Sequence, residues 1–222
     1  MIMSIGLLRE LMSFDACMKS IDIETRFEQI AEMLFESFAI QKGKTMYLFK
    51  EIEFYFYNKN HRDIIAHPRV SKALCWYIND FGGIDLNFTS NIKLGIKLDN
   101  KGKKVWKYIL DDNSYFGGIL VRQLICEDGT ENLTGPWACA ELFRGYDATG
   151  VDMYNDLPIL VEHDCGKGNY IRGARRNLLR SNQQPEKKVD NILYAYLEHP
   201  RKDILYKDFL KFKDKPYRYE KQ

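Results

Sequence analysis

The spacing of apolar residues changes along the chain, and each change predicts a different element. Between residues 23 and 38 the apolar positions recur at intervals of three and four: Ile23, Phe27, Ile30, Leu34 and Phe38. This spacing predicts an amphipathic helix. From Thr45 to Tyr57 the period becomes two and aromatic residues dominate, which is typical of a β-strand.

Later segments repeat the strand pattern. Further strands are predicted at 84–89, 92–98, 116–125 and 157–162, a helix start at Thr134-Gly135-Pro136, and a helix within 189–213. No long linker rich in Pro, Gly or Ser separates these segments. We therefore expect one α+β domain over 1–222, with a mostly antiparallel, curved sheet flanked by helices. Residues 1–43 are the expected helical N-terminal part, 44–165 the sheet and pocket, and 166–222 a basic helical C-terminal part.

The strand at 45–57 carries two carboxylates on an aromatic face. Strict alternation places Glu51 and Glu53 with four aromatic residues, and puts Leu48, Lys50, Ile52, Phe54 and Phe56 on the other face. The four aromatic residues are Tyr47, Phe49, Tyr55 and Tyr57. A poorly solvated carboxylate suits a general base or acid. The alternative is a surface glutamate paired with a lysine.

Arg122 interrupts the apolar strand 116–125. A buried guanidinium needs a carboxylate or an anionic ligand, and Glu51 or Glu53 is the obvious partner. Arg122 therefore belongs either to a functional site or to a structural ion pair.

Other reactive residues lack the spacing that a known site requires. His61 and His67 lie near each other in the sequence without a matching set of metal ligands. His163 and Cys165 flank Asp164, and we expect no nucleophilic pair among these residues, because neighbours on a strand face opposite ways. We expect no metal and no cofactor.

Composition narrows the class of protein. Of 222 residues, 45% are hydrophobic and 29% charged, and no apolar run approaches the roughly 18 residues that span a bilayer. The five cysteines are scattered without a C-x-x-C motif, which favours reduced thiols in a cytoplasmic protein over a disulfide framework. We expect no association with a membrane.

The formal net charge of +2 hides an uneven distribution. Residues 166–222 hold 15 Lys and Arg against 7 Asp and Glu, a net +8, whereas residues 1–165 hold 18 against 24, a net −6. A basic C-terminal quarter on an acidic body is either a face that binds a polyanion or an ordinary solvated surface.

Taken in order, several segments resemble motifs of the alkyladenine (3-methyladenine) DNA glycosylase family. The resemblance covers roughly residues 24–218. The matching segments are Ile30-Ala31-Glu32-Met33-Leu34, Lys50-Glu51-Ile52-Glu53-Phe54-Tyr55, Asp63-Ile64-Ile65-Ala66-His67, Ile84-Asp85-Leu86-Asn87, Leu120-Val121-Arg122-Gln123-Leu124, Gly135-Pro136, Asp156-Leu157-Pro158-Ile159-Leu160-Val161 and Arg172-Gly173-Ala174-Arg175-Arg176-Asn177.

The resemblance implies a methylpurine-DNA-glycosylase-like fold and a role for each matched residue. Glu53 is the implied catalytic base, with Arg122 helping to hold the nucleophilic water. Tyr55, His67 and Tyr77 are the implied walls around a flipped base, and Asn87 the residue that discriminates between bases. From the C-terminal charge and the matched segment there, we expect Arg172, Arg175 and Arg176 to contact the DNA backbone.

The function implied is that of a monomeric DNA N-glycosylase of base-excision repair. Such a hydrolase flips an alkylated or otherwise damaged purine out of double- or single-stranded DNA and hydrolyses its N-glycosidic bond. Two alternatives stay open: an N-glycosidase for another nucleoside substrate, and a non-catalytic nucleic-acid-binding module of the same fold.

The sequence departs from the family at three places. The position where the family inserts an aromatic wedge into DNA holds Asp80, beside Phe81. The segment from Asn91 to Ser114 is longer than the family has, and Trp137-Ala138-Cys139 follows Gly135-Pro136 in place of the usual residues.

Overall fold

A computed structural model describes residues 4–79, 82–98, 101–144, 157–178 and 202–222. Its helices are α1 (Ile5–Leu11), α2 (Ser20–Ser37), α3 (Pro136–Glu141) and α6 (Lys202–Phe212). Its strands are β1 (Phe38–Lys42), β2 (Thr45–Asn58), β3 (His61–Arg62), β4 (Trp76–Ile78), β5 (Ile84–Asn87), β6 (Lys93–Leu98), β7 (Lys104–Ile109), β8 (Phe116–Cys126), β9 (Asn132–Thr134), β10 (Ile159–Glu162), β11 (Tyr170–Gly173) and β12 (Arg218–Lys221).

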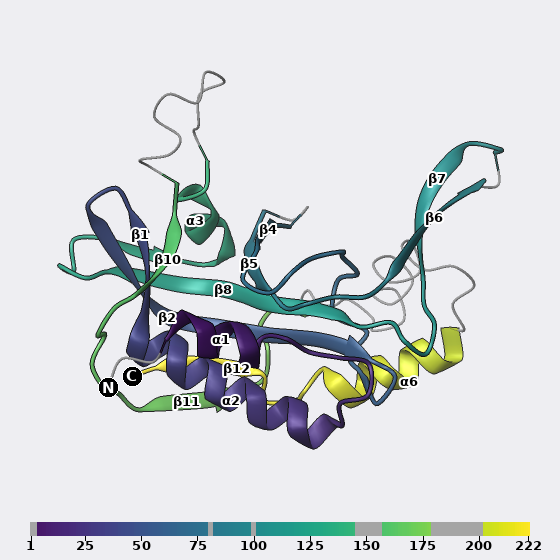
Figure 1. Cartoon of the computed structure of the whole chain (residues 1–222), viewed down its shortest axis with the longest axis horizontal. Helices are drawn as coiled ribbons and strands as arrows, with labels where there is room; N and C mark the ends of the chain where they lie inside the picture. The colour runs from purple at the N-terminus through teal and green to yellow at the C-terminus, as the bar shows by residue number, and fades with distance from the viewer. Residues whose placement is uncertain (1–3, 80–81, 99–100, 145–156, 179–201) are drawn as a thin grey trace.

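Helix α2 forms as its apolar spacing predicts, and it packs on the main sheet (Figure 1). Its buried stripe includes Ile23, Phe27, Ile30 and Leu34. The ring of Phe27 stacks on that of Phe54 of β2, with 4.5 Å between the ring centroids. Phe38 ends the helix and begins strand β1.

Strand β2 is the centre of a curled antiparallel sheet. It pairs with β8 along most of its length, while β1, β12 and β3 share its other edge. The main path runs β10-β1-β2-β8-β5-β4, and every pairing between the described strands is antiparallel. The predicted α+β class and curved antiparallel sheet are therefore confirmed.

The pairing of β2 with β8 is irregular at the two carboxylates. The register shifts on either side of Glu51, so Lys50 on β2 and Arg122 on β8 have no paired residue opposite them. A bulge of this kind turns the following side chains to the other face. The prediction that Tyr47 and Phe49 share the face of Glu51 is therefore wrong, because both lie in the main core with Ile52, Phe54 and Phe56.

The C-terminal part differs from its helical prediction. Only α6 is helical among its described residues, while strand β12 pairs with the edge of β2 and β11 pairs with β12. The rest of the predicted helix, up to residue 201, lies outside the described residues. Helix α3 begins one residue later than Thr134 predicts, because its N-cap is Gly135, whose φ of 92° favours glycine.

None of the helices in the described ranges is long and apolar enough to cross a membrane. All five cysteines lie within those ranges, and none of them is joined in a disulfide there.

Candidate functional site

Sheet register brings five of the predicted site residues to one face of the sheet. Across β2, β8, β5 and β4 the paired residues are Glu53, Leu120, Asp85 and Tyr77, and the adjacent row is Tyr55, Gly118 and Asn87. Directly paired residues point to the same face of a sheet. Arg122 lies two residues beyond Leu120 on β8, and it reaches the same cluster.

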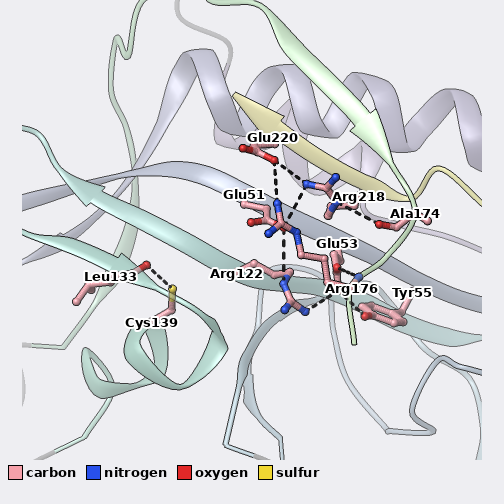
Figure 2. A network of polar contacts seen from close by, with 10 residues as sticks. All are labelled: Glu51, Glu53, Tyr55, Arg122, Leu133, Cys139, Ala174, Arg176, Arg218 and Glu220. Atoms are coloured by element: carbon pink, nitrogen blue, oxygen red, sulfur yellow. Dashed lines mark hydrogen bonds and ion pairs between the residues drawn. The ribbon is translucent and has the colours of Figure 1, made fainter. Parts of the chain in front are cut away.

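Glu53 is held by three donors, one each from β2, β8 and the segment that follows β11 (Figure 2). Its Oε2 accepts hydrogen bonds from the Tyr55 hydroxyl at 2.6 Å and from Nη1 of Arg122 at 3.0 Å. Its Oε1 accepts one from the backbone N–H of Arg176 at 2.6 Å. The side chain of Glu53 is 0% exposed, so these three donors replace the water that a carboxylate otherwise binds.

Glu51 faces a concentration of positive charge. Its Oε1 lies 3.0 Å from Nε of Arg176, 3.5 Å from Nη1 of Arg218 and 3.8 Å from Nε of Arg122. None of these contacts has hydrogen-bond geometry, so this buried oxygen is stabilised by charge alone. Burial raises the pKa of Glu51, an effect that the neighbouring arginines oppose.

Tyr55 is a hydrogen-bond donor in this cluster at all ordinary pH values. Burial raises its pKa well above the usual range, and the negative charge of Glu53 adds to the effect. Arg122 is left unpaired in the ladder between β2 and β8, and its side chain reaches Glu53, whose paired residue is Leu120. The prediction that Arg122 has a carboxylate partner is confirmed, and the partner is Glu53.

Asn87 belongs to a second polar network that the sequence did not indicate. Its Oδ1 accepts a hydrogen bond from Nη1 of Arg69 at 3.0 Å, and its Nδ2 donates to Oγ of Ser71 at 2.7 Å. Arg69 also forms a buried ion pair with Asp85, whose other oxygen accepts from Asn79 at 2.7 Å. Gly118 separates Asn87 from Tyr55, so the middle of that row carries no side chain.

His67 lies beside Tyr77, which ends the row of Glu53, Leu120 and Asp85. Their ring centroids are 6.4 Å apart and their planes are inclined by 34°. The guanidinium of Arg69 lies 4.5 Å from the centroid of Tyr77, so one face of this ring already has a cationic neighbour. The distance between the rings is close to twice the roughly 3.4 Å that separates stacked bases along a strand.

The three arginines predicted to contact phosphate are all engaged with the protein. Arg172 pairs with Glu28 of α2, and Arg176 pairs with Glu51 and with Glu220 at 3.2 Å. Arg175 is fully buried and binds both oxygens of Asp63, at 2.6 and 3.1 Å. The prediction of a phosphate contact is therefore wrong for Arg175, because its charge has no access to solvent.

Burial and pairing also set the charge states around Arg175. Burial by itself lowers the pKa of Arg175, but the adjacent carboxylate of Asp63 outweighs it and raises the pKa overall. His61 is buried nearby, and burial together with the charge of Arg175 lowers its pKa to about 3. His61 is therefore a neutral core residue, whose Nδ1 lies 3.0 Å from Oγ of Ser20.

No cluster of three or more metal-ligating side chains occurs within the ranges that the structure covers. His163 lies 2.8 Å from Glu127, and the thiol of Cys165 donates to the carbonyl of Phe38 at 3.2 Å. These two side chains serve structural contacts of their own. The predicted wedge position, Asp80, and the neighbouring Phe81 lie outside the described residues.

Three comparisons with known proteins give no relative for this chain. No family model matches the sequence, no curated protein matches it, and no solved structure matches the fold. The chemistry of the site therefore rests on the geometry described above.

Proposed function

We propose that the chain is a DNA N-glycosylase that hydrolyses the N-glycosidic bond of an alkylated or otherwise damaged purine. The observation that carries the proposal is the placement of Glu53, Arg122 and Tyr55 in contact, on the sheet face that also carries Asn87 and Tyr77. A base flipped out of the duplex requires stacking groups, a polar residue that reads its edge, and a carboxylate at the sugar.

Glu53 would act as the general base. It takes a proton from a water molecule, whose oxygen then bonds to the anomeric carbon of the sugar while the bond to the purine nitrogen breaks. The departing base leaves with the electron pair of that bond. Arg122 and the Tyr55 hydroxyl orient the carboxylate through Oε2, so Oε1 is the oxygen best placed to receive the proton.

Access to Oε1 depends on the segment around Arg176. The only donor to this oxygen among the described residues is the backbone N–H of Arg176. The side chain of Arg176 is 50% exposed, in contrast to the buried side chains beneath it. Displacement of this segment by substrate would free Oε1 for water without disturbing Arg122 or Tyr55.

His67 and Tyr77 would bound the flipped base, and Asn87 would read its edge. Asn87 is fixed by Arg69 and Ser71, and a fixed polar group rejects a base whose donors do not match it. The gap at Gly118 leaves the space between Tyr55 and Asn87 free of any side chain from β8.

Release of free base from DNA tests the proposal. Purified protein is incubated with methylated DNA, both double- and single-stranded, and released purines are measured by chromatography. General-base catalysis contributes about 10²–10⁴-fold to a rate. Glu53→Gln should therefore lower the rate of base release by at least about 10²-fold. Glu141→Gln, at an exposed glutamate, is the matched control and should retain the wild-type rate.

A non-catalytic nucleic-acid-binding module is the second candidate. It is favoured by the complete burial of Glu53 and the saturation of both its oxygens by protein donors. In that case no base is released from either form of DNA, while binding persists and Glu53→Gln affects only stability.

A further inference from the structure

Strands β6 and β7 form a ribbon that stands apart from the main sheet. They pair only with each other among the described strands, from Lys93 opposite Ile109 to Leu98 opposite Lys104. In Figure 1 the ribbon rises at one end of the molecule, on the side of β8 away from α2. This ribbon occupies the segment 91–114 that the family resemblance leaves unexplained.

One face of the ribbon is apolar and exposed to solvent. Leu94 and Ile96 on β6 lie opposite Tyr108 and Trp106 on β7. Trp106 is 63% exposed and Leu98, at the outer end, is 67% exposed. Exposed large apolar side chains grouped on one projecting element mark an interaction surface.

The ribbon is also strongly basic. Residues 93–107 contain six lysines and one aspartate, a net charge of +5 in a chain whose total is +2. At the base of the ribbon Lys93 pairs with Asp111 at 2.8 Å. The other lysines are Lys97, Lys101, Lys103, Lys104 and Lys107, and all but Lys107 are classed as exposed.

The shape and charge of the ribbon fit a nucleic acid. A two-stranded β-ribbon has the dimensions to enter the major groove of DNA. Lysines supply phosphate contacts of the sequence-independent kind. The apolar and aromatic side chains lie on the face that also carries Lys104, opposite to Lys97 and Lys107, and side chains of this kind stack on bases or wedge between base steps.

The base of the ribbon connects it to the candidate site. Ile92 at the foot of β6, with Tyr108 and Leu110, packs into a small apolar cluster that also includes Tyr57. Tyr55, which donates to Glu53, packs against the same cluster. The foot of the ribbon and Tyr55 therefore contact the same apolar cluster.

We propose that the β6–β7 ribbon is a nucleic-acid-binding arm. Its lysines contact backbone phosphates, and the face of Leu94, Ile96 and Trp106 contacts sugars or bases. The choice of DNA as the ligand rests on the proposed function, whereas binding by the arm does not require hydrolysis.

The test is a binding titration of the full chain with a fluorescein-labelled 20-base-pair duplex, and with one of its strands, at several salt concentrations. In the arm variant Lys97, Lys103 and Lys104 are each changed to Gln. Each lost phosphate contact lowers the slope of log K against log salt by about 0.9, so the expected decrease is about 2 to 3. The matched control changes three exposed lysines elsewhere, Lys19, Lys44 and Lys167, to Gln and should keep the wild-type slope.

Trp106→Ala separates stacking from charge. It should weaken binding roughly fivefold to a hundredfold, as loss of a stacked aromatic does, while the salt slope stays at the wild-type value. Weakening by both arm variants but not by the control supports the proposal.

Three outcomes would overturn the arm. The first is an equal change of salt slope in the arm variant and the control variant. The second is that the wild-type protein does not bind DNA at low salt. The third is that the arm variant no longer binds anionic phosphatidylserine vesicles, which the wild type binds, while its binding to DNA is unchanged. The last result would assign the ribbon to a lipid surface. DNA binding through the arm without any release of base would contradict the proposed hydrolysis and leave the arm intact.

Discussion

The two most basic regions of this chain use their charge in opposite ways. The described arginines of residues 166–222 turn toward the protein, where Arg172, Arg175 and Arg176 meet Glu28, Asp63 and Glu51. The lysines of the β6–β7 ribbon stand on a projecting element and are mostly exposed. Charge counted along a sequence therefore does not indicate which basic side chains a polyanion can reach.

The residue types explain part of this difference. A guanidinium is planar, weakly hydrated and able to bind both oxygens of a carboxylate, so arginine suits buried pairs such as Arg175 with Asp63. An ammonium is compact and strongly hydrated, so lysine favours exposed positions. The arginines near β2 hold the site together, while most lysines of the ribbon are exposed to solvent.

The largest loss of stability is expected at Arg175, the most deeply buried of the three C-terminal arginines. Arg175→Gln leaves Asp63 as an uncompensated buried charge and removes the bonds of Arg175 to the carbonyls of Phe54 and Phe212. Breaking a buried pair in this way costs about 3–5 kcal/mol. Urea unfolding measures the loss, and a cost below about 1 kcal/mol would show that Arg175 is not held as described.

A pH effect on stability of about 2 kcal/mol between pH 6.5 and 4.5 is expected from the histidine beside Arg175. The pKa of His61 is lowered to about 3 in the folded state, so this group stabilises the fold above its unfolded pKa of about 6.5. As pH falls from 6.5 toward 3, only the unfolded state binds the proton, and stability declines by at most about 1.4 kcal/mol per pH unit.

Urea unfolding at pH 6.5 and 4.5 of the wild type and of His61→Leu isolates this contribution. The variant lacks the titrating group, so its stability should fall less over that range. The control is His163→Gln, at a histidine that is partly exposed, and it should follow the wild type. Equal declines in wild type and His61→Leu would mean that His61 is not buried as a neutral group.

The smallest loss of stability is expected for the partly exposed ion pair between Arg172 and Glu28. Arg172→Gln removes the ion pair with Glu28, and both side chains are partly exposed. Such pairs contribute about 0–1 kcal/mol, so unfolding should change little. The phosphate contact predicted for Arg172 is tested with the same variant: a decrease of about one in the slope of log K against log salt would confirm it, and an unchanged slope would contradict it.

Regular periodicity made the central elements predictable from sequence. The spacing of three and four between Ile23 and Phe38 predicted helix α2. The apolar run at 116–125, interrupted by Arg122, predicted strand β8. The rule that a buried charge needs a partner predicted a carboxylate beside Arg122, with Glu51 and Glu53 as alternatives, and the structure pairs it with Glu53.

The elements that escaped prediction lack such a period or depend on distant contacts. Strand β12, Arg218–Lys221, is short and mostly charged, and it exists because its backbone pairs with β2. The bulge at Lys50 and Arg122 requires both strands at once. The network of Arg69, Asp85 and Asn87 joins residues on a loop and a strand, and nothing in their local sequence indicates that they meet.

The central claim is that Glu53 catalyses the release of base, while the β6–β7 ribbon contributes affinity for DNA. Single-turnover release of methylated purine, measured with increasing excess of protein over DNA, separates the two roles. We predict that Glu53→Gln releases base at least about 10²-fold more slowly than the wild type at every protein concentration, whereas the variant with Gln at 97, 103 and 104 reaches the wild-type rate once the DNA is saturated. Release by Glu53→Gln at the wild-type rate, or no release by the wild type itself, would contradict the account.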